Sequence, residues 1–71
     1  DARLSGLTQR ETEIFLMLAK GTSMRMIAEH LCLSGKTVSN YLTLLKSKLQ
    51  VSSHAEMVHL AIETGLLRIA A

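Results

Sequence analysis

The residues best suited to bind a ligand lie between positions 35 and 49, where polar and basic side chains recur at helical spacing. Four apolar residues there are three or four positions apart, which predicts one buried face of a helix from about Gly35 to Leu49. These are Val38, Leu42, Leu45 and Leu49. The opposite face combines short polar and basic side chains, which attract anions and exchange hydrogen bonds, and it has no carboxylate. These residues are Lys36, Ser39, Asn40, Thr43 and Lys46.

The distribution of charge around this face is also uneven. No Asp or Glu occurs between Glu29 and Glu56, whereas Lys36, Lys46 and Lys48 all fall within that interval. An exposed helix commonly mixes Glu with Lys, because opposite charges four residues apart stabilise it. A basic face without acids is suited to contact phosphates and base edges instead. The charge distribution alone is explained equally well by an ordinary solvated surface that happens to have few acidic residues.

The types and spacing of the remaining reactive residues do not favour a catalytic or metal-binding site. His54 and His59 are five residues apart, so they do not share a helix face as metal ligands would. His30 and Cys32 flank a predicted turn, and the serines in the chain are better explained as helix caps. We therefore predict no catalytic residue, no metal and no cofactor. The single cysteine allows no internal disulfide, which favours a cytoplasmic protein, and we expect Cys32 to be buried.

Capping residues indicate where the helices that position the 35–49 segment begin and end. Thr8 and Glu11 form a capping box that begins a helix, and Gly21 ends it. Ser23 begins a second, short helix with Ile27, Ala28 and Leu31 on its apolar face. The turn Cys32-Leu33-Ser34 follows, and Ser34 caps the helix described above. Two helices joined by a tight three-residue turn predict a helix-turn-helix.

A fourth helix is predicted from the capping box Ser53-His54-Ala55-Glu56 to about Gly65. Apolar residues cover more than half of its circumference, which a helix packed on one face does not need. We expect a second buried face toward a partner, although a deeply inset helix in a small fold is the alternative.

Size and composition set the fold class. Seventy-one residues allow one domain, and a hydrophobic content of 48% with only 3% aromatic residues predicts an aliphatic helical core. We predict an all-α, compact four-helix bundle spanning residues 1–71, ordered from about 4 to 67, with the first six residues loose. No apolar run reaches the ~20 residues that cross a bilayer, and no signal peptide is visible. Because the chain begins at Asp1 without Met, we expect a piece of a longer protein.

Several spaced elements resemble the LuxR/NarL-type helix-turn-helix, the C-terminal domain of many bacterial response regulators and quorum-sensing receptors. The resemblance covers about residues 4 to 67. It is carried by Leu7-Thr8-x-Arg10-Glu11, Leu18-Ala19-x-Gly21, Ile27-Ala28, and Leu33-Ser34-x-Lys36-Thr37-Val38 through Lys48-Leu49.

The resemblance implies transcription regulation by a homodimer on paired operator half-sites of double-stranded DNA. The third predicted helix, about Gly35–Leu49, would enter the major groove. The resemblance places three side chains against the bases, namely Ser39, Asn40 and Thr43. It places five on the DNA backbone, namely Lys36, Thr37, Tyr41, Lys46 and Lys48. The dimer contacts would come from the last helix, through Ala55, Val58, His59 and Ile62. It also implies a receiver or ligand-binding domain N-terminal to this chain, a cytoplasmic location and RNA polymerase as a further partner.

The sequence departs from the family pattern at a few positions. The family often has a basic residue where Ser39 stands and a His where Tyr41 stands, which predicts weaker electrostatic binding and a different sequence preference. Leu16, Leu44 and Leu60 occupy positions that are commonly polar. Scattered exposed leucines can lack any role, and the alternative is that they mark contacts with a receiver domain, a dimer mate or polymerase. A helical protein-interaction module without specific DNA readout is the alternative function. Such a surface would be expected to carry apolar anchors on the third helix, where Leu44 is the only candidate.

Overall fold

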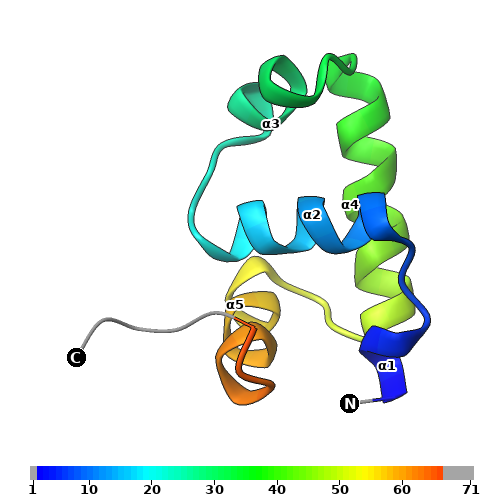
Figure 1. Cartoon of the computed structure of the whole chain (residues 1–71), viewed down its shortest axis with the longest axis vertical. Coiled ribbons are helices and arrows are strands. Elements are labelled where there is room, and N and C mark those ends of the chain that lie inside the picture. Colours follow the sequence, from blue (N-terminus) through cyan, green and yellow to red (C-terminus); the bar gives the residue numbers. More distant parts are fainter. Residues whose placement is uncertain (1, 67–71) are drawn as a thin grey trace.

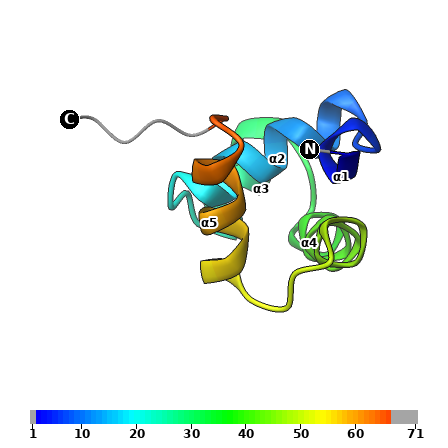
Figure 2. The same cartoon turned by 90° about the horizontal axis from the view of Figure 1, so that it is seen from below.

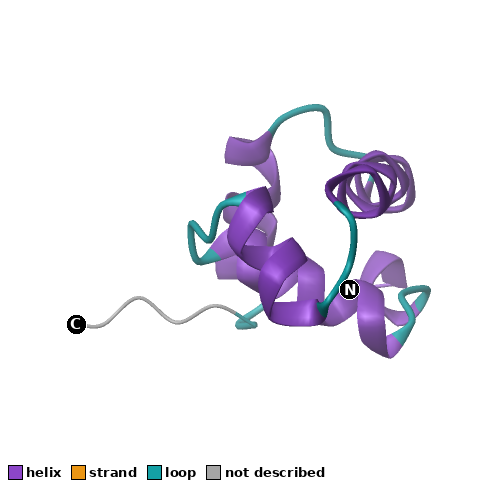
Figure 3. Ribbon diagram, turned by 90° about the horizontal axis from the view of Figure 1, so that it is seen from above, coloured by secondary structure: helices purple, strands orange, loops and turns teal. Residues whose placement is uncertain are grey.

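The computed structural model describes residues 2–66, and these residues form five α-helices and no strand (Figures 1 and 3). The helices are α1 (Ala2–Ser5), α2 (Gln9–Ala19), α3 (Met24–Leu31), α4 (Gly35–Leu49) and α5 (His54–Glu63). The all-α class and the four predicted helices are confirmed. The short α1 is additional, and it occupies the segment that was expected to be loose. Residue 67, the predicted end of the ordered part, lies outside the described residues.

Each of the four longer helices begins at a predicted N-cap. The side-chain oxygens of Thr8, Ser23, Ser34 and Ser53 accept hydrogen bonds from the backbone amide three residues later. This contact satisfies an amide that has no partner within the helix. The predicted reciprocal capping box at the start of α2 is confirmed, because the Thr8 amide donates to Glu11 Oε1 at 2.8 Å.

The capping box predicted at the start of α5 is half wrong. The Glu56 amide donates to Ser53 Oγ at 3.2 Å, as predicted. The Glu56 carboxylate, however, accepts from the backbone amide of Ser52 at 2.8 Å and from Ser52 Oγ at 3.1 Å. The carboxylate thus reaches one residue beyond the cap, where two donors are within reach instead of one.

The helix ends use the left-handed backbone conformation. Gly21 follows α2 with φ of 90° and Gly65 follows α5 with φ of 79°, as expected for residues without a Cβ. The ends of α3 and α4 use Cys32 and Gln50, both at φ of 57°. Left-handed non-glycine residues are uncommon. A local hydrogen bond closes the chain around each of them, from the Leu33 amide to the Ala28 carbonyl at 2.8 Å and from the Val51 amide to the Lys46 carbonyl at 3.1 Å.

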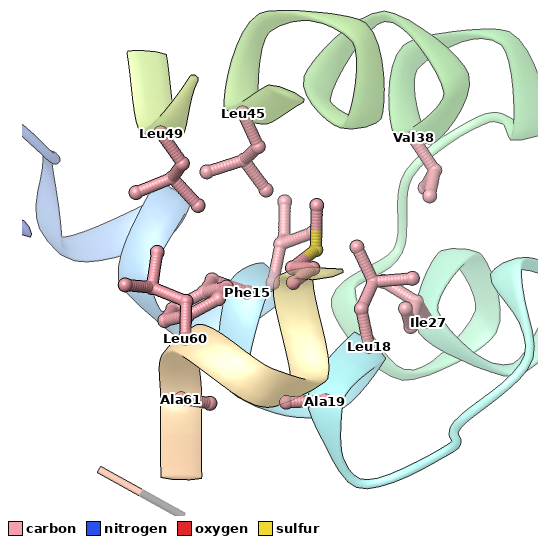
Figure 4. Close-up of a cluster of buried hydrophobic side chains, with 11 residues drawn as sticks. Phe15, Leu18, Ala19, Ile27, Val38, Leu45, Leu49, Leu60 and Ala61 are labelled. Atoms are coloured by element: carbon pink, nitrogen blue, oxygen red, sulfur yellow. The ribbon is translucent and has the colours of Figure 1, made fainter. Parts of the chain in front are cut away.

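The core is formed where α2 crosses α4 (Figures 1 and 4). Phe15 is completely buried, and α2 contacts α3, α4 and α5 around it. The buried apolar residues are Ile14, Phe15, Leu18, Ala19, Ile27, Val38, Leu45, Leu49, Met57, Leu60 and Ala61. Figure 4 shows Val38, Leu45 and Leu49 pointing from α4 toward this cluster. The sequence-predicted buried face of α4 is therefore confirmed at these three positions.

One side of α4 is left uncovered by this packing. Figures 2 and 3 look at α4 nearly end-on, and no other described helix lies along its outer side. The short α1 is tied to the end of α4, because Arg3 Nη1 donates to the carbonyl oxygen of Leu49 at 3.0 Å. None of the described helices is long and apolar enough to cross a membrane.

Candidate nucleic-acid interface

The turn between α3 and α4 fixes where α4 begins. The backbone amide of Leu33 donates to the Ala28 carbonyl at 2.8 Å, which closes the end of α3 around the left-handed Cys32. Ser34 then accepts from the Thr37 amide at 3.1 Å. Leu33 packs against the core. Local hydrogen bonds and one apolar anchor therefore set the direction of α4, and the predicted helix-turn-helix is present.

The outer side of α4 is exposed, as the sequence predicted. Lys36, Ser39, Asn40 and Thr43 are exposed and Lys46 is half-buried. We call these five residues the outer strip of α4. It contains no carboxylate, and neither lysine forms an ion pair within the described part of the chain. The outer strip is thus a polar, positively charged surface opposite the buried face of the same helix.

The hydrogen bonds of the outer strip leave most of its polar atoms available. Thr43 Oγ1 donates to the Ser39 carbonyl at 3.2 Å, which uses the Thr43 hydroxyl proton and leaves its oxygen as an acceptor. Asn40 is exposed, so its amide can offer both a donor and an acceptor to a ligand. The strip therefore presents one side chain capable of paired hydrogen bonding, flanked by single hydroxyl groups.

Three residues of the proposed backbone-contact set lie on one flank of the strip. With about 100° per residue, Thr37, Tyr41 and Lys48 point to the same side of α4. Thr37 and Tyr41 are half-buried. The Thr37 hydroxyl accepts from Ser34 Oγ at 2.9 Å, so it takes part in the helix cap.

Lys48 differs from the lysines of the outer strip because its charge is already paired. Lys48 Nζ lies 2.9 Å from Glu11 Oε1 and 3.0 Å from Oε2, and 3.5 Å from the carbonyl oxygen of Gly6. In this structure the Lys48 side chain connects α4 to the start of α2, and its predicted contact with the DNA backbone stays an untested prediction. Moving this ammonium to a phosphate would leave the buried Glu11 carboxylate without its charged partner.

Glu11 is the only buried ionisable residue in the described part of the chain, with 3% of its surface exposed. Its pKa is lowered, first by the hydrogen bond from the Thr8 backbone amide and then by the hydrogen bond from Lys48. Burial opposes this shift, because it disfavours the charged form. Glu11 thus remains a carboxylate that holds two helices together.

The α5 residues predicted to form dimer contacts lie on an accessible surface. Ala55, His59 and Ile62 are exposed and Val58 is half-buried, whereas Met57, Leu60 and Ala61 face the core. His59 Nε2 lies 2.8 Å from Glu63 Oε1 on the outer side of the helix. The described structure thus divides α5 into a core face and an outer face, and it does not test what covers the outer face.

The three leucines at commonly polar positions and the single cysteine were also identified in the sequence, and the structure shows how far each is buried. Leu60 is buried with 4% exposure, so it is a core residue and its assignment as a protein-contact candidate is wrong. Leu16 is half-buried and Leu44 is 42% exposed. Cys32 is exposed, contrary to the prediction of a buried residue, because it occupies the turn after α3 and not the apolar face of that helix. No group of His, Cys, Asp or Glu within residues 2–66 is placed to hold a metal ion.

Three features of the structure were not predicted from the sequence. The Glu11–Lys48 pair joins residues 37 positions apart, and no local pattern announces such a contact. Arg3 reaches the end of α4 from a segment predicted to be loose. Arg25, on α3, is 89% exposed and only loosely paired with Glu29 at 3.8 Å, so it adds positive charge to the helix-turn-helix.

Comparison with known proteins is consistent with this geometry. Residues 5–61 match the family described as bacterial regulatory proteins, luxR family. The chain is 82% identical over all 71 residues to the transcriptional activator protein ExaE of Pseudomonas putida, of which it covers 33%. It is 41% identical over 66 residues, or 93% of the chain, to the response regulator UvrY of Escherichia coli K12, covering 30% of that protein. It is 36% identical over 67 residues, or 94% of the chain, to the response regulator GacA of Pseudomonas aeruginosa, covering 31%. The chain thus spans about a third of the length of these relatives.

Proposed function

This chain belongs to the LuxR family of bacterial regulatory proteins, and we propose that it binds a specific duplex DNA sequence by inserting α4 into the major groove. Membership supports DNA-binding transcription regulation and a non-enzymatic role. The observation that supports the finer proposal is the outer strip of α4, which is polar, free of carboxylates and exposed at every position except the half-buried Lys46. A helix with its side chains fits the width of the major groove of B-DNA.

Affinity in this proposal comes mainly from phosphate contacts. Lys36 and Lys46 have no competing ion pair in the described residues, so they are available to displace counterions. Thr37 and Tyr41, on the flank, add hydroxyl contacts to the backbone. The amides at the start of α4, near Gly35, point outward with the positive end of the helix dipole and offer a further phosphate contact.

Sequence preference would come from Asn40, Ser39 and Thr43. The Asn40 amide matches the paired acceptor and donor of adenine in the major groove, a contact worth about 1–3 kcal/mol of discrimination. Ser39 can serve as donor or acceptor. Thr43 would accept, because its proton is directed to the Ser39 carbonyl. Since Ser39 is short and uncharged, we expect less electrostatic binding here than a basic residue would give.

One copy covers only a few base pairs, so we propose a homodimer on paired half-sites. The outer face of α5, with Ala55, Val58, His59 and Ile62, is the proposed contact between the two copies.

Two relatives are named response regulators, and the chain spans about a third of each. We propose on this basis that the full protein is a cytoplasmic response regulator of a two-component system. In it, an N-terminal receiver domain would control this domain, and RNA polymerase would be a further partner. A ligand-binding domain in place of the receiver is the less favoured arrangement.

Selection of bound duplexes from random DNA, followed by titration at two salt concentrations, tests the proposal. We expect a recurring half-site, present in two copies, and binding that weakens as salt rises. Two lysine contacts per chain predict a loss of about 12-fold per copy between about 50 and about 200 mM salt. Enrichment of no sequence, together with salt-insensitive binding, would favour the alternative of a protein-interaction module.

A further inference from the structure

A small hollow lies on the flank of α4 beside the outer strip. It has a volume of about 270 Å³ and is lined by Thr37, Asn40, Tyr41 and Leu44. Asn40, Tyr41 and Leu44 follow Thr37 by three, four and seven positions, so all four residues share one side of the helix. Leu44 is 42% exposed, which is unusual among the leucines of α4, since Leu45 and Leu49 are completely buried. Leu44 is therefore not part of the core, and its side chain is accessible to a ligand.

Most of the hollow is apolar. The Thr37 hydroxyl accepts a hydrogen bond from Ser34, and Tyr41 is half-buried against the core. Leu44 contributes only carbon atoms. Asn40 is the one lining residue with an amide, and its side chain is exposed and forms no hydrogen bond in the described structure. The hollow is thus an apolar recess with an amide at its edge.

The position of the hollow indicates its occupant. Leu44 follows Asn40 by one helical turn, about 6 Å along the axis and about 40° around it. It is therefore next to the side chain proposed to contact a base, on a helix that has no carboxylate of its own. The only apolar group on a base edge in the major groove is the 5-methyl group of thymine.

We propose that Leu44, with Thr37 and Tyr41, receives the 5-methyl group of a thymine in the half-site and is thereby a specificity-determining residue. This inference rests on the proposed function. Because base pairs are stacked about 3.4 Å apart, the thymine would lie about two steps from the base that Asn40 contacts. The structure thus assigns the exposed leucine a role in reading thymine against uracil or cytosine.

In the test, each thymine of the selected duplex is replaced by uracil, one at a time, and binding of the chain to each duplex is measured by fluorescence anisotropy. For the unmodified chain we expect one thymine per half-site whose replacement weakens binding about 3- to 5-fold, the effect of losing one buried methyl group. For Leu44→Ala the same replacement should have almost no effect. Helix content measured by circular dichroism should be unchanged, because Leu44 is exposed and Ala is a good helix former.

Thr43→Ser is the matched control, because it removes a methyl group from the outer strip and keeps the hydroxyl. This variant should retain the sensitivity to uracil. The inference is overturned if no thymine is sensitive, if Leu44→Ala remains as sensitive as the unmodified chain, or if Thr43→Ser alone removes the sensitivity. In all three cases the selected duplex is still bound, so the proposed function stands. If the selected duplex is bound no better than random DNA, the proposed function fails, and the inference fails with it.

Discussion

Replacing Lys48 by methionine should destabilise the domain, because it leaves the buried Glu11 carboxylate without its ammonium partner. Methionine keeps much of the apolar stem of Lys48 and removes the ammonium group, with its charge and its hydrogen bonds to Glu11. Hydrogen bonds to charged groups contribute about 1.5–3 kcal/mol each to stability. Glu11 is 3% exposed, but the Lys48 side chain is 35% exposed, so solvent screens part of the interaction. We therefore expect a loss of about 2 kcal/mol, which lowers Tm by about 8–16 °C in a domain of this size.

The same substitution should reduce the acid sensitivity of folding. The pKa of Glu11 is lowered in the folded state, so its contribution to stability is complete above its unfolded pKa of about 4.5 and is lost as pH falls through the folded value. In Lys48→Met the folded pKa should rise toward the unfolded one, although the Thr8 amide still lowers it. The pH dependence below about 4.5 should therefore be shallower than in the unmodified chain.

Lys46→Met is the matched control, since Lys46 is on the same helix and forms no ion pair in the described residues. Thermal unfolding of the two variants, followed by circular dichroism, should show a loss for Lys48→Met and a change within about 0.5 kcal/mol for Lys46→Met. The effects of the two substitutions on DNA binding should be the opposite of their effects on stability. Lys46→Met should reduce the magnitude of the slope of log K against log salt by about one unit, while Lys48→Met should leave this slope nearly unchanged. Equal melting temperatures, or equal losses of slope, would refute this division of roles.

Four further substitutions probe separate parts of the structure. Asn40→Ala should reduce preference at one base position by about 1–3 kcal/mol and leave binding to scrambled duplexes unchanged, as measured by competition titrations. Leu45→Ala, at a completely buried position, should cost about 2–5 kcal/mol in urea unfolding. Ser34→Ala removes the N-cap of α4 and should cost about 1 kcal/mol in the same assay. Ile62→Asp should reduce affinity for paired half-sites to the level of a single half-site, while binding to a single half-site and Tm stay the same.

The parts of the fold that the sequence predicted depend on local physics. A cap such as Thr8 or Ser34 acts on amides within three residues, so its position is visible in the sequence itself. The buried face of α4 follows from helical spacing in the same way, and Val38, Leu45 and Leu49 are indeed buried. These local signals sufficed to predict four helices and the exposed outer strip.

The features that escaped prediction depend on contacts between distant segments. Glu11 was identified as a capping residue, but its pairing with Lys48 requires α2 and α4 to cross at that point. Arg3 orders its segment by reaching Leu49, again across the fold. Leu60 was named as a candidate for protein contacts because its position is commonly polar in the family, whereas the packing of α5 on α2 buries it. Cys32 is the exception, because its misplacement has a local cause: its apolar neighbours suggested a core position, and the left-handed turn carries it to the surface instead.

The most direct test of the proposed interface is to follow the backbone amide NMR signals of the chain while the selected duplex is added. We expect the largest shifts on the outer strip of α4, at Lys36, Ser39, Asn40, Thr43 and Lys46, and little change at the core-facing residues of α5. Shifts concentrated on α5 or α2, with the outer strip of α4 unchanged, would contradict the proposed interface.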